Sequence, residues 1–486
     1  MKSITATTAW LLLLAACLGL AGCRKGGDLA GYPNIVLITL DTTRADHLGT
    51  YGYFRDTSPR IDAFAEQSIV FERAIAPMAT TLPTHVSILT ATHPLEHGVL
   101  ANVMHGGRRF VPAAGLRSFA TVCLEQGYRT AAFVSAAPLK RDSGIQVGFE
   151  TFDEPEGSDA ERNGGETTDA ALRWLAGLEA RPFLLWVHYY DAHWPFAAPV
   201  PFADRYRTDA ALERYIAERR IAAASLREGV GREEARPTLN AYDAELHYQD
   251  LQVGRLLDAL QARRDWDRTA VVLVGDHGEG LSQHGHAAHG GTWNEQLRSP
   301  LLIRAPGHEP RRLTRTISLV DTLPTLLGLL DAPALEDFLE QASGRDVLAG
   351  GSEPGAVLSQ DTGRPSKPGA YRLALTSTRW KYFQIYDGEK GEEVGQELYD
   401  LEADPFELAD VSKRHPETTR QLRTQLIVQI EEQQERAEHR SRGARPRTQA
   451  TNPSILEQLR ALGYLEEAET TTAPEEASGR SAPAEP

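Results

Sequence analysis

Four apolar runs of strand length constrain the fold of this 486-residue chain more than any other feature of its sequence. None of them shows the polar alternation of a half-exposed strand, so each is expected to be buried on both faces of a sheet. Between the runs, apolar residues recur at the spacing of amphipathic helices. Alternating strands and helices predict an α/β fold with a large, mostly parallel, mixed sheet sandwiched between helices. The runs are Asn34–Leu40, Thr130–Val134, Phe183–Val187 and Thr269–Val274.

The pattern changes near residue 351, where short strand-like segments precede a helical stretch around 416–437. We expect a smaller C-terminal α+β subdomain, an antiparallel sheet plus a helix, over 351–465, after a main domain over 34–350. A charged, helix-prone insertion at 201–240 is expected to shape or cover the site. Residues 466–486 form an acidic tail without large apolar residues, which predicts disorder.

The first residues have the pattern of an export signal. Lys2 precedes an apolar run too short to span a membrane with its own flanks. The segment Leu20-Ala-Gly-Cys23 is similar to the lipobox of bacterial lipoproteins, with an ordinary signal peptide as the alternative. We expect removal of 1–22, lipidation of Cys23 and a tether over 23–33. The result would be an exported cell-envelope lipoprotein, on the periplasmic or outer face of a bacterial membrane.

Charge and cysteine content exclude two further features. The formal net charge of −16 argues against nucleic acid as a partner. Of the three cysteines, Cys17 would leave with the signal and Cys23 would be lipidated, so Cys123 would have no thiol to pair with. The fold is therefore expected to depend on its core and to contain no intrachain disulfide.

Polar residues follow three of the apolar runs directly. Asp41 follows the first run, Asp191 lies just beyond the third, and Asp276-His277 follows the fourth. A single Asp after a strand usually makes a turn or caps a helix. Three such strand ends predict one convergent site, because open α/β sheets bind their ligands at the carboxyl ends of the strands.

A second candidate feature is the segment Thr80-Thr81-Leu82-Pro83-Thr84-His85. Pro83 suits the first turn of a helix, which places Thr81 just ahead of the helix N-terminus. The unpaired amides and the dipole there favour an anion, so the Thr81 hydroxyl could attack or carry a phosphoryl or sulfuryl group. The alternative is an ordinary helix cap.

Three segments identify the chain as similar to the sulfatase family of the alkaline phosphatase superfamily. Residues 37–52, which contain Asp41-Thr-Thr-Arg44-Ala-Asp46, resemble the family's opening segment. Gly275-Asp-His-Gly-Glu279 resembles its second metal-binding segment, and Glu397-Leu-Tyr-Asp-Leu-Glu-Ala-Asp-Pro405 resembles its closing segment. The resemblance covers about 34–465 and implies a metal-dependent ester hydrolase with an alkaline-phosphatase/sulfatase-like fold.

The sequence departs from the sulfatase pattern at three positions. Sulfatases carry a Cys or Ser that is converted to formylglycine, whereas Thr81 occupies that position here. Thr is a secondary alcohol and cannot yield that aldehyde, so the resemblance favours the branches with a threonine nucleophile, which act on phosphate or phosphonate esters. Thr42 replaces a second metal-binding Asp, and His85 replaces an Arg, which weakens the case for help from His85 in catalysis.

The resemblance also implies a metal centre. Asp41, Asp276 and His277, with the Thr81 oxygen, would bind one divalent ion, and this donor set favours Mn²⁺ or Zn²⁺ over Ca²⁺. Asp191 would serve a second metal only in a two-zinc arrangement, which we do not expect.

Two further histidines occupy positions where the family contacts the transferred group. His193 and His289 would bind that group or assist the leaving oxygen. The substrate class is a small-molecule, glycan or lipid ester, and the oligomeric state is not indicated.

The leading interpretation is a hydrolase that uses Thr81 on phosphate or phosphonate esters. One alternative is a phosphoethanolamine- or phosphoglycerol-type transferase, although such relatives usually bring several membrane spans. Another is a true sulfuric ester hydrolase that works without formylglycine. A non-catalytic binding protein is disfavoured by the joint presence of Asp41, Thr81, Asp276 and His277.

The lipobox-like segment predicts the behaviour of the variant Cys23→Ala. This variant should remain unprocessed or become soluble, because its acyl chains would have no attachment point. Membrane fractionation and metabolic labelling with a radiolabelled fatty acid measure the effect. A wild-type chain that takes up no label would contradict the prediction.

Overall fold

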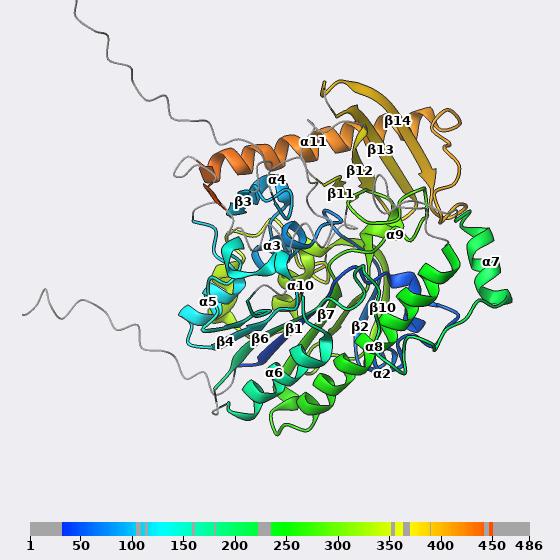
Figure 1. Ribbon diagram of the computed structural model, residues 1–486. Coiled ribbons are helices and arrows are strands. Elements are labelled where there is room, and N and C mark those ends of the chain that lie inside the picture. The colour runs from blue at the N-terminus through cyan, green and yellow to red at the C-terminus, as the bar shows by residue number, and fades with distance from the viewer. Residues whose placement is uncertain are drawn as a thin grey trace, which may run out of the picture.

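The computed structural model of the protein describes residues 32–103, 108–111, 115–157, 161–178, 181–221, 235–350, 355–362, 370–388, 390–441 and 447–450. A nine-stranded sheet with helices on both faces forms the main body (Figure 1). Its order is β10-β2-β9-β7-β1-β6-β4-β5, with β8 paired to β2. The predicted α/β class is confirmed. The expected signal peptide, Cys23 and the acidic tail lie outside the described residues.

The four apolar runs form the centre of this sheet. β1 (Asn34–Leu40) lies between β6 (Phe183–Tyr189) and β7 (Thr269–Gly275) and is parallel to both. β4 (Arg129–Phe133) continues the parallel part beside β6. Every residue of β1, β6 and β7 is buried, which explains why the sequence shows no polar alternation there.

Strands on one side of the centre make the sheet mixed. β9 (Leu301–Arg304) is antiparallel to β7 and to β2 (Ile69–Ile75), and β10 (Arg311–Ser318) is parallel to β2. Charged residues interrupt β2 and β10, so neither gives a continuous apolar run.

The helices cover the two faces in separate sets. Alternate residues of β1 pack into different cores: Ile35 and Leu37 into one, Val36 and Ile38 into the other. The first face is covered by α3 (Thr81–Thr90), α5 (Phe119–Glu125) and α10 (Thr322–Leu329). The second is covered by α2 (Pro59–Ala65), α6 (Gly164–Ala176) and α8 (Ala235–Gln261).

A smaller antiparallel sheet lies beside the main body, with the long helix α11 (Pro416–Ser441) across both (Figure 1). Leu422 and Leu426 of α11 pack in one core with Leu375 and Tyr382 of this sheet. The sheet consists of β11 (Val357–Gln360), β12 (Ala370–Thr376), β13 (Trp380–Asp387) and β14 (Glu393–Asp400), in that order. This arrangement agrees with the predicted α+β subdomain.

The other elements are short. In the insertion at 201–240, α7 (Ala210–Glu218) forms and α8 begins, while 222–234 lie outside the described residues. No helix within the described ranges is long and apolar enough to cross a membrane. The remaining α-helices and strands of the described ranges are α4 (Pro94–His97), α9 (Asn294–Leu297), β3 (Arg108–Val111), β5 (Thr151–Asp153), β8 (Arg298–Ser299) and β15 (Arg447–Ala450).

The buried centre predicts the cost of truncating one of its side chains. Leu273→Ala in β7 should lower the free energy of unfolding by about 2–5 kcal/mol, because the side chain is fully buried and leaves a cavity. Urea denaturation measures the change. Leu251→Ala on α8 is the control, since Leu251 is 42% exposed. Equal costs at both positions would contradict the assignment of β7 to the core.

Candidate active site

Two acids lie where the central strands end. Asp41 directly follows β1, and its amide donates to the Tyr189 carbonyl at 2.9 Å. Asp276 directly follows β7, and its amide donates to the Leu40 carbonyl at 3.2 Å. Both acids are fully buried, and His277 is buried beside them. One ligand atom from each of Asp41, Asp276 and His277 lies within 4.8 Å of the others.

The hydrogen bonds of these three residues leave one atom of each without a partner. The amides of Thr42 and His277 donate to Asp276 Oδ1 at 3.2 and 2.7 Å. His277 Nδ1 donates to the Gly278 carbonyl at 2.9 Å, so Nε2 carries a lone pair. Asp41 Oδ1, Asp276 Oδ2 and His277 Nε2 have no hydrogen-bond partner. Two carboxylate oxygens and one imidazole nitrogen, fixed in this way, fit a divalent cation.

His188 orients Asp41 and was not among the predicted site residues. The Ser135 amide donates to His188 Nδ1 at 3.3 Å, so the proton on Nε2 points at Asp41 Oδ2, 3.2 Å away. Second contacts of this kind hold a metal ligand in one orientation. His188 comes beside Asp41 through the register of the sheet, which pairs it with Thr39 next to the end of β1, and the sequence carries no local signal for that pairing.

The charges of the three residues are unbalanced without a cation. Burial, followed by the neighbouring Asp41, raises the pKa of Asp276 well above its ordinary value. Burial also raises the pKa of Asp41 and lowers that of His277, which keeps this imidazole neutral. Desolvated carboxylates side by side need positive charge or a proton. A divalent cation would supply that charge.

Thr81 contacts this centre from the N-terminus of α3. Thr80 is extended (φ −154°, ψ 130°), and the helix begins at Thr81, one residue earlier than expected. Pro83 still lies in the first turn, where its missing N–H has no partner to lose. A hydrogen bond between the Thr81 side chain and Asp41 lowers the pKa of that acid, against the larger effect of its burial. The hydroxyl is therefore beside a candidate metal ligand.

His85 contacts the backbone of Thr81. Its Nδ1 donates to the Thr81 carbonyl at 2.7 Å, and its Nε2 accepts from the Thr39 hydroxyl at 3.0 Å. Burial lowers the pKa of His85 to about 3, so the ring is neutral. These contacts give His85 a positioning role for the N-terminus of α3.

His193 and His289 lie close together but differ in their hydrogen bonds. Their ring centroids are 5.1 Å apart. His193 Nδ1 donates to the Trp194 carbonyl, and burial lowers its pKa to about 3, so Nε2 is an acceptor. His289 Nδ1 lies 3.1 Å from Glu279 Oε2, and this ion pair raises its pKa although burial lowers it. His289 is therefore the better proton donor of the two.

Asp191 and Thr42 face other partners. Asp191 Oδ1 accepts from the Gly164 amide at 2.7 Å, at the first residue of α6, whose N-cap is Asn163. It does not belong to the group of three metal-type ligands. Thr42, in the left-handed region at φ 48°, donates its hydroxyl to the Ala192 carbonyl at 2.7 Å. Neither side chain adds a ligand to this centre.

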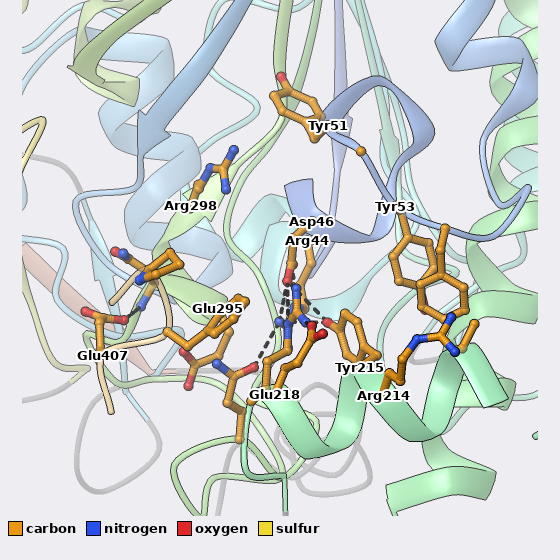
Figure 2. A pocket seen from close by; sticks show the side chains of 18 residues that line it. Arg44, Asp46, Tyr51, Tyr53, Arg214, Tyr215, Glu218, Glu295, Arg298 and Glu407 are labelled. Atoms are coloured by element: carbon orange, nitrogen blue, oxygen red, sulfur yellow. Dashed lines mark hydrogen bonds and ion pairs between the residues drawn. The ribbon is translucent and has the colours of Figure 1, made fainter. Parts of the chain in front are cut away.

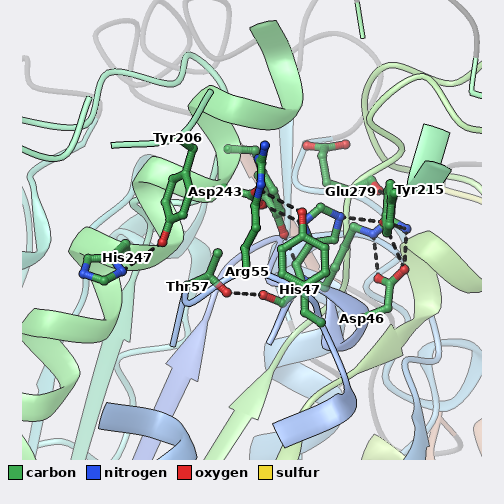
Figure 3. A network of polar contacts seen from close by, with 12 residues as sticks. Asp46, His47, Arg55, Thr57, Tyr206, Tyr215, Asp243, His247 and Glu279 are labelled. Carbon is green, nitrogen blue, oxygen red and sulfur yellow. Dashed lines mark hydrogen bonds and ion pairs between the residues drawn. The ribbon is translucent and has the colours of Figure 1, made fainter. Parts of the chain in front are cut away.

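A buried polar network supports the segment that follows Asp41 (Figure 3). Asp243 Oδ1 and His47 Nδ1 are 2.8 Å apart, and His47 Nε2 lies 2.7 Å from the Tyr215 hydroxyl of α7. Arg44 forms an ion pair with Asp46 at 2.9 Å and also donates to the Glu279 carbonyl at 3.2 Å. The network thus joins α7 and α8 to the loop that carries Glu279.

The chain resembles known sulfatases in sequence. The family profile described as Sulfatase matches residues 33–332, more than half of the chain. Arylsulfatase K of Gallus gallus is 30% identical over 201 residues, which cover 39% of this chain and 36% of that protein. Iduronate 2-sulfatase of Mus musculus is 25% identical over 355 residues, covering 61% and 64%. The chain thus spans less than two thirds of the length of either relative.

Solved structures share its fold. The yidJ protein of Bacteroides fragilis has a TM-score of 0.69 at 19% identity, covering 86% of this chain and 99% of that one. The phosphonate monoester hydrolase of Agrobacterium radiobacter has a TM-score of 0.62 at 20% identity, covering 82% and 96%. On the extent of the profile match, the chain belongs to the sulfatase family.

Proposed function

We propose that the protein is a metal-dependent hydrolase of phosphate or phosphonate esters, with Thr81 as its nucleophile. The observation that carries this proposal is the contact of the Thr81 side chain with Asp41, beside the unpartnered atoms of Asp276 and His277. Membership of the sulfatase family supports ester hydrolysis. The fold likeness to a phosphonate monoester hydrolase is compatible with the proposed substrate class.

The threonine at position 81 bears on whether the substrate is a sulfate ester or a phosphate or phosphonate ester. A sulfatase that uses formylglycine needs a Cys or Ser at this position, and a secondary alcohol cannot be oxidised to that aldehyde. A threonine oxygen can instead attack phosphorus directly and form a phosphothreonine ester. Thr81 therefore favours phosphate or phosphonate esters over sulfate esters.

Asp41, Thr81, Asp276 and His277 would hold the metal. When bound, a divalent cation lowers the pKa of a coordinated hydroxyl and polarises an ester oxygen. Three oxygen donors with one imidazole suit Mn²⁺ or Zn²⁺, with Ca²⁺ less favoured. We propose a single ion, because Asp191 lies outside the group of three metal-type ligands and the Thr42 hydroxyl donates to the Ala192 carbonyl.

The side chains around Thr81 suit the two halves of the reaction. The Thr81 hydroxyl loses its proton to solvent as its oxygen attacks phosphorus, the bond to the leaving oxygen breaks, and protonated His289 gives that oxygen its proton. Water then attacks the phosphothreonine ester and passes a proton to the His193 acceptor nitrogen while the bond from phosphorus to Thr81 breaks. Exchange with solvent returns a proton to the Thr81 oxygen and to His289 and removes the proton from His193. The ion pair with Glu279 keeps His289 suited to donation, and the Trp194 carbonyl keeps His193 suited to acceptance.

Two alternative activities would use the same site residues. A phosphoethanolamine- or phosphoglycerol-type transferase would pass the group from Thr81 to an acceptor alcohol instead of water. A sulfuric ester hydrolase working without formylglycine would follow the activity of the relatives named sulfatases. Side-by-side assays on aryl sulfate, phosphate monoester, phosphodiester and phosphonate substrates separate these. We further propose that the ester substrate is a small molecule, a glycan or a lipid. We also propose that a lipid anchor at Cys23 holds the protein on a membrane.

Replacement of the nucleophile gives the most direct test. Thr81→Ala should lower the rate per folded molecule by about 10³-fold or more, and Thr81→Ser should retain part of the activity. Thr90→Ala, near the other end of α3, is the matched control and should keep the wild-type rate. If Thr81 only capped the helix, Thr81→Ala would lower the stability by about 0.5–2 kcal/mol and change the turnover of folded protein little. A Thr81→Ala rate within tenfold of wild type would rule out the nucleophile.

The metal has its own test. Asp276→Asn should lose bound metal and most activity while remaining folded, because Asp276 lies past the end of β7 and contributes no apolar side chain to the core. Elemental analysis of the purified protein measures the metal. EDTA should lower the Tm of wild type, since a ligand that binds only the folded state stabilises it. Exposed Asp204→Asn is the control, and undiminished metal in Asp276→Asn would refute the ligand assignment.

A further inference from the structure

A cavity lies apart from the candidate metal centre. Its volume is about 370 Å³, within the range of ligand pockets. The segment after β1, helix α7, the start of β8 and the loop at 405–407 line it, and none of the proposed catalytic or metal-binding residues does. Figure 2 shows Arg298 and Arg214 on opposite sides of the view, with Arg44 and Asp46 between them.

Each carboxylate of this cavity lies beside a basic side chain. Four acids line it, and each has a basic side chain within ion-pair distance. These contacts leave little negative charge to repel an anion. The pairs are Asp46 with Arg44 at 2.9 Å, Glu218 with Arg219 at 3.6 Å, Glu295 with His284 at 2.9 Å and Glu407 with Lys381 at 2.8 Å.

The arginines retain donors for a ligand. Within the described part of the chain, Arg214 and Arg298 form no ion pair, and Arg298 Nε donates only to the Glu72 carbonyl at 2.9 Å. Arg219 lies between the rings of Tyr215 and Phe406, 3.7 and 4.2 Å from their centroids. Its buried Nε lies 3.7 Å from Asp46 Oδ2, within ion-pair distance, and makes no hydrogen bond. Guanidinium groups in this state suit sulfate, phosphate or carboxylate oxygens.

The same cavity also offers an acceptor and aromatic surface. Glu295 is 5% exposed, and its Oε2 has no hydrogen-bond partner, so it can accept from a hydroxyl group. The rings of Tyr53, Phe54 and Phe406 contribute apolar area. An anion that also carries hydroxyl groups and a flat apolar face can bind the arginine donors, the Glu295 acceptor and the aromatic rings together.

We propose that this cavity is a second binding site for an anionic saccharide unit, which carries sulfate or carboxylate groups on a sugar ring. The site would bind a unit of a longer chain at a distance from the ester that is cleaved. Arg44 connects the two places, because it lines the cavity and donates to the carbonyl of Glu279, whose carboxylate pairs with His289. Binding here does not depend on Thr81 acting as the nucleophile.

Calorimetric titration with a heparin-derived tetrasaccharide tests the site in the full, metal-loaded chain. Arg214→Glu and Arg298→Gln should each weaken binding by about tenfold or more, as expected when a hydrogen bond to a charged group is lost. Both should keep kcat/KM on an aryl phosphonate within twofold of wild type, because this small ester does not reach the cavity. A neutral maltotetraose should not bind.

Controls make the result decisive. Exposed Arg264 lies between α8 and β7, so Arg264→Glu makes the same charge change as Arg214→Glu at a site away from the cavity. This variant should leave the tetrasaccharide Kd within twofold of wild type. The variant Thr81→Ala should bind the tetrasaccharide as wild type does, which separates this proposal from the proposed nucleophile. Unchanged binding in Arg214→Glu and Arg298→Gln, equal loss in Arg264→Glu, equal binding of maltotetraose, or no binding to wild type would each overturn the proposal.

Discussion

The parallel pairing of β1 with both β6 and β7 is the constraint on which the rest of the site depends. Backbone hydrogen bonds continue past the strand ends into Asp41 and Asp276, so the peptide groups of both acids are fixed by the sheet. Helices pack on both faces and bury this centre completely. A shift of one strand would unpair buried backbone groups, which makes the relative position of the two acids rigid.

Burial of these carboxylates costs free energy that a cation can offset. Each ligand has its second polar atom held by the protein, through the amides beside Asp276, the carbonyl next to His277, and His188 against Asp41. The remaining atoms point to one place without rearrangement. A site arranged in this way is prepared for a metal and for charge that develops there during a reaction.

The small C-terminal subdomain contributes to the loops around the centre. Glu407 pairs with Lys381 at 2.8 Å in a fully buried ion pair, and it accepts from the Asn294 amide at 2.7 Å. The His284 ring stacks on Trp293 at 3.8 Å and lies 3.1 Å from the Glu407 carbonyl. Removal of one charge from such a pair leaves the other buried and unpaired. The two parts of the molecule are therefore joined through the loop that follows Asp276.

The sequence by itself determined the central strands, the strand-end acids and the threonine near the N-terminus of α3, because continuous apolar runs, metal-type residues and a proline in the first helical turn are local signals. It could not identify His188, whose role depends on its register beside Thr39. Tertiary structure also decided that Asp191 accepts from the first amide of α6, that His85 holds the Thr81 backbone, and that His193 and His289 differ in protonation. The arginine-lined cavity is likewise visible only in three dimensions, since its walls come from segments spread between residues 44 and 407. Contacts between distant segments leave no periodic pattern in the chain, and burial sets the charge of each group only once the fold has formed.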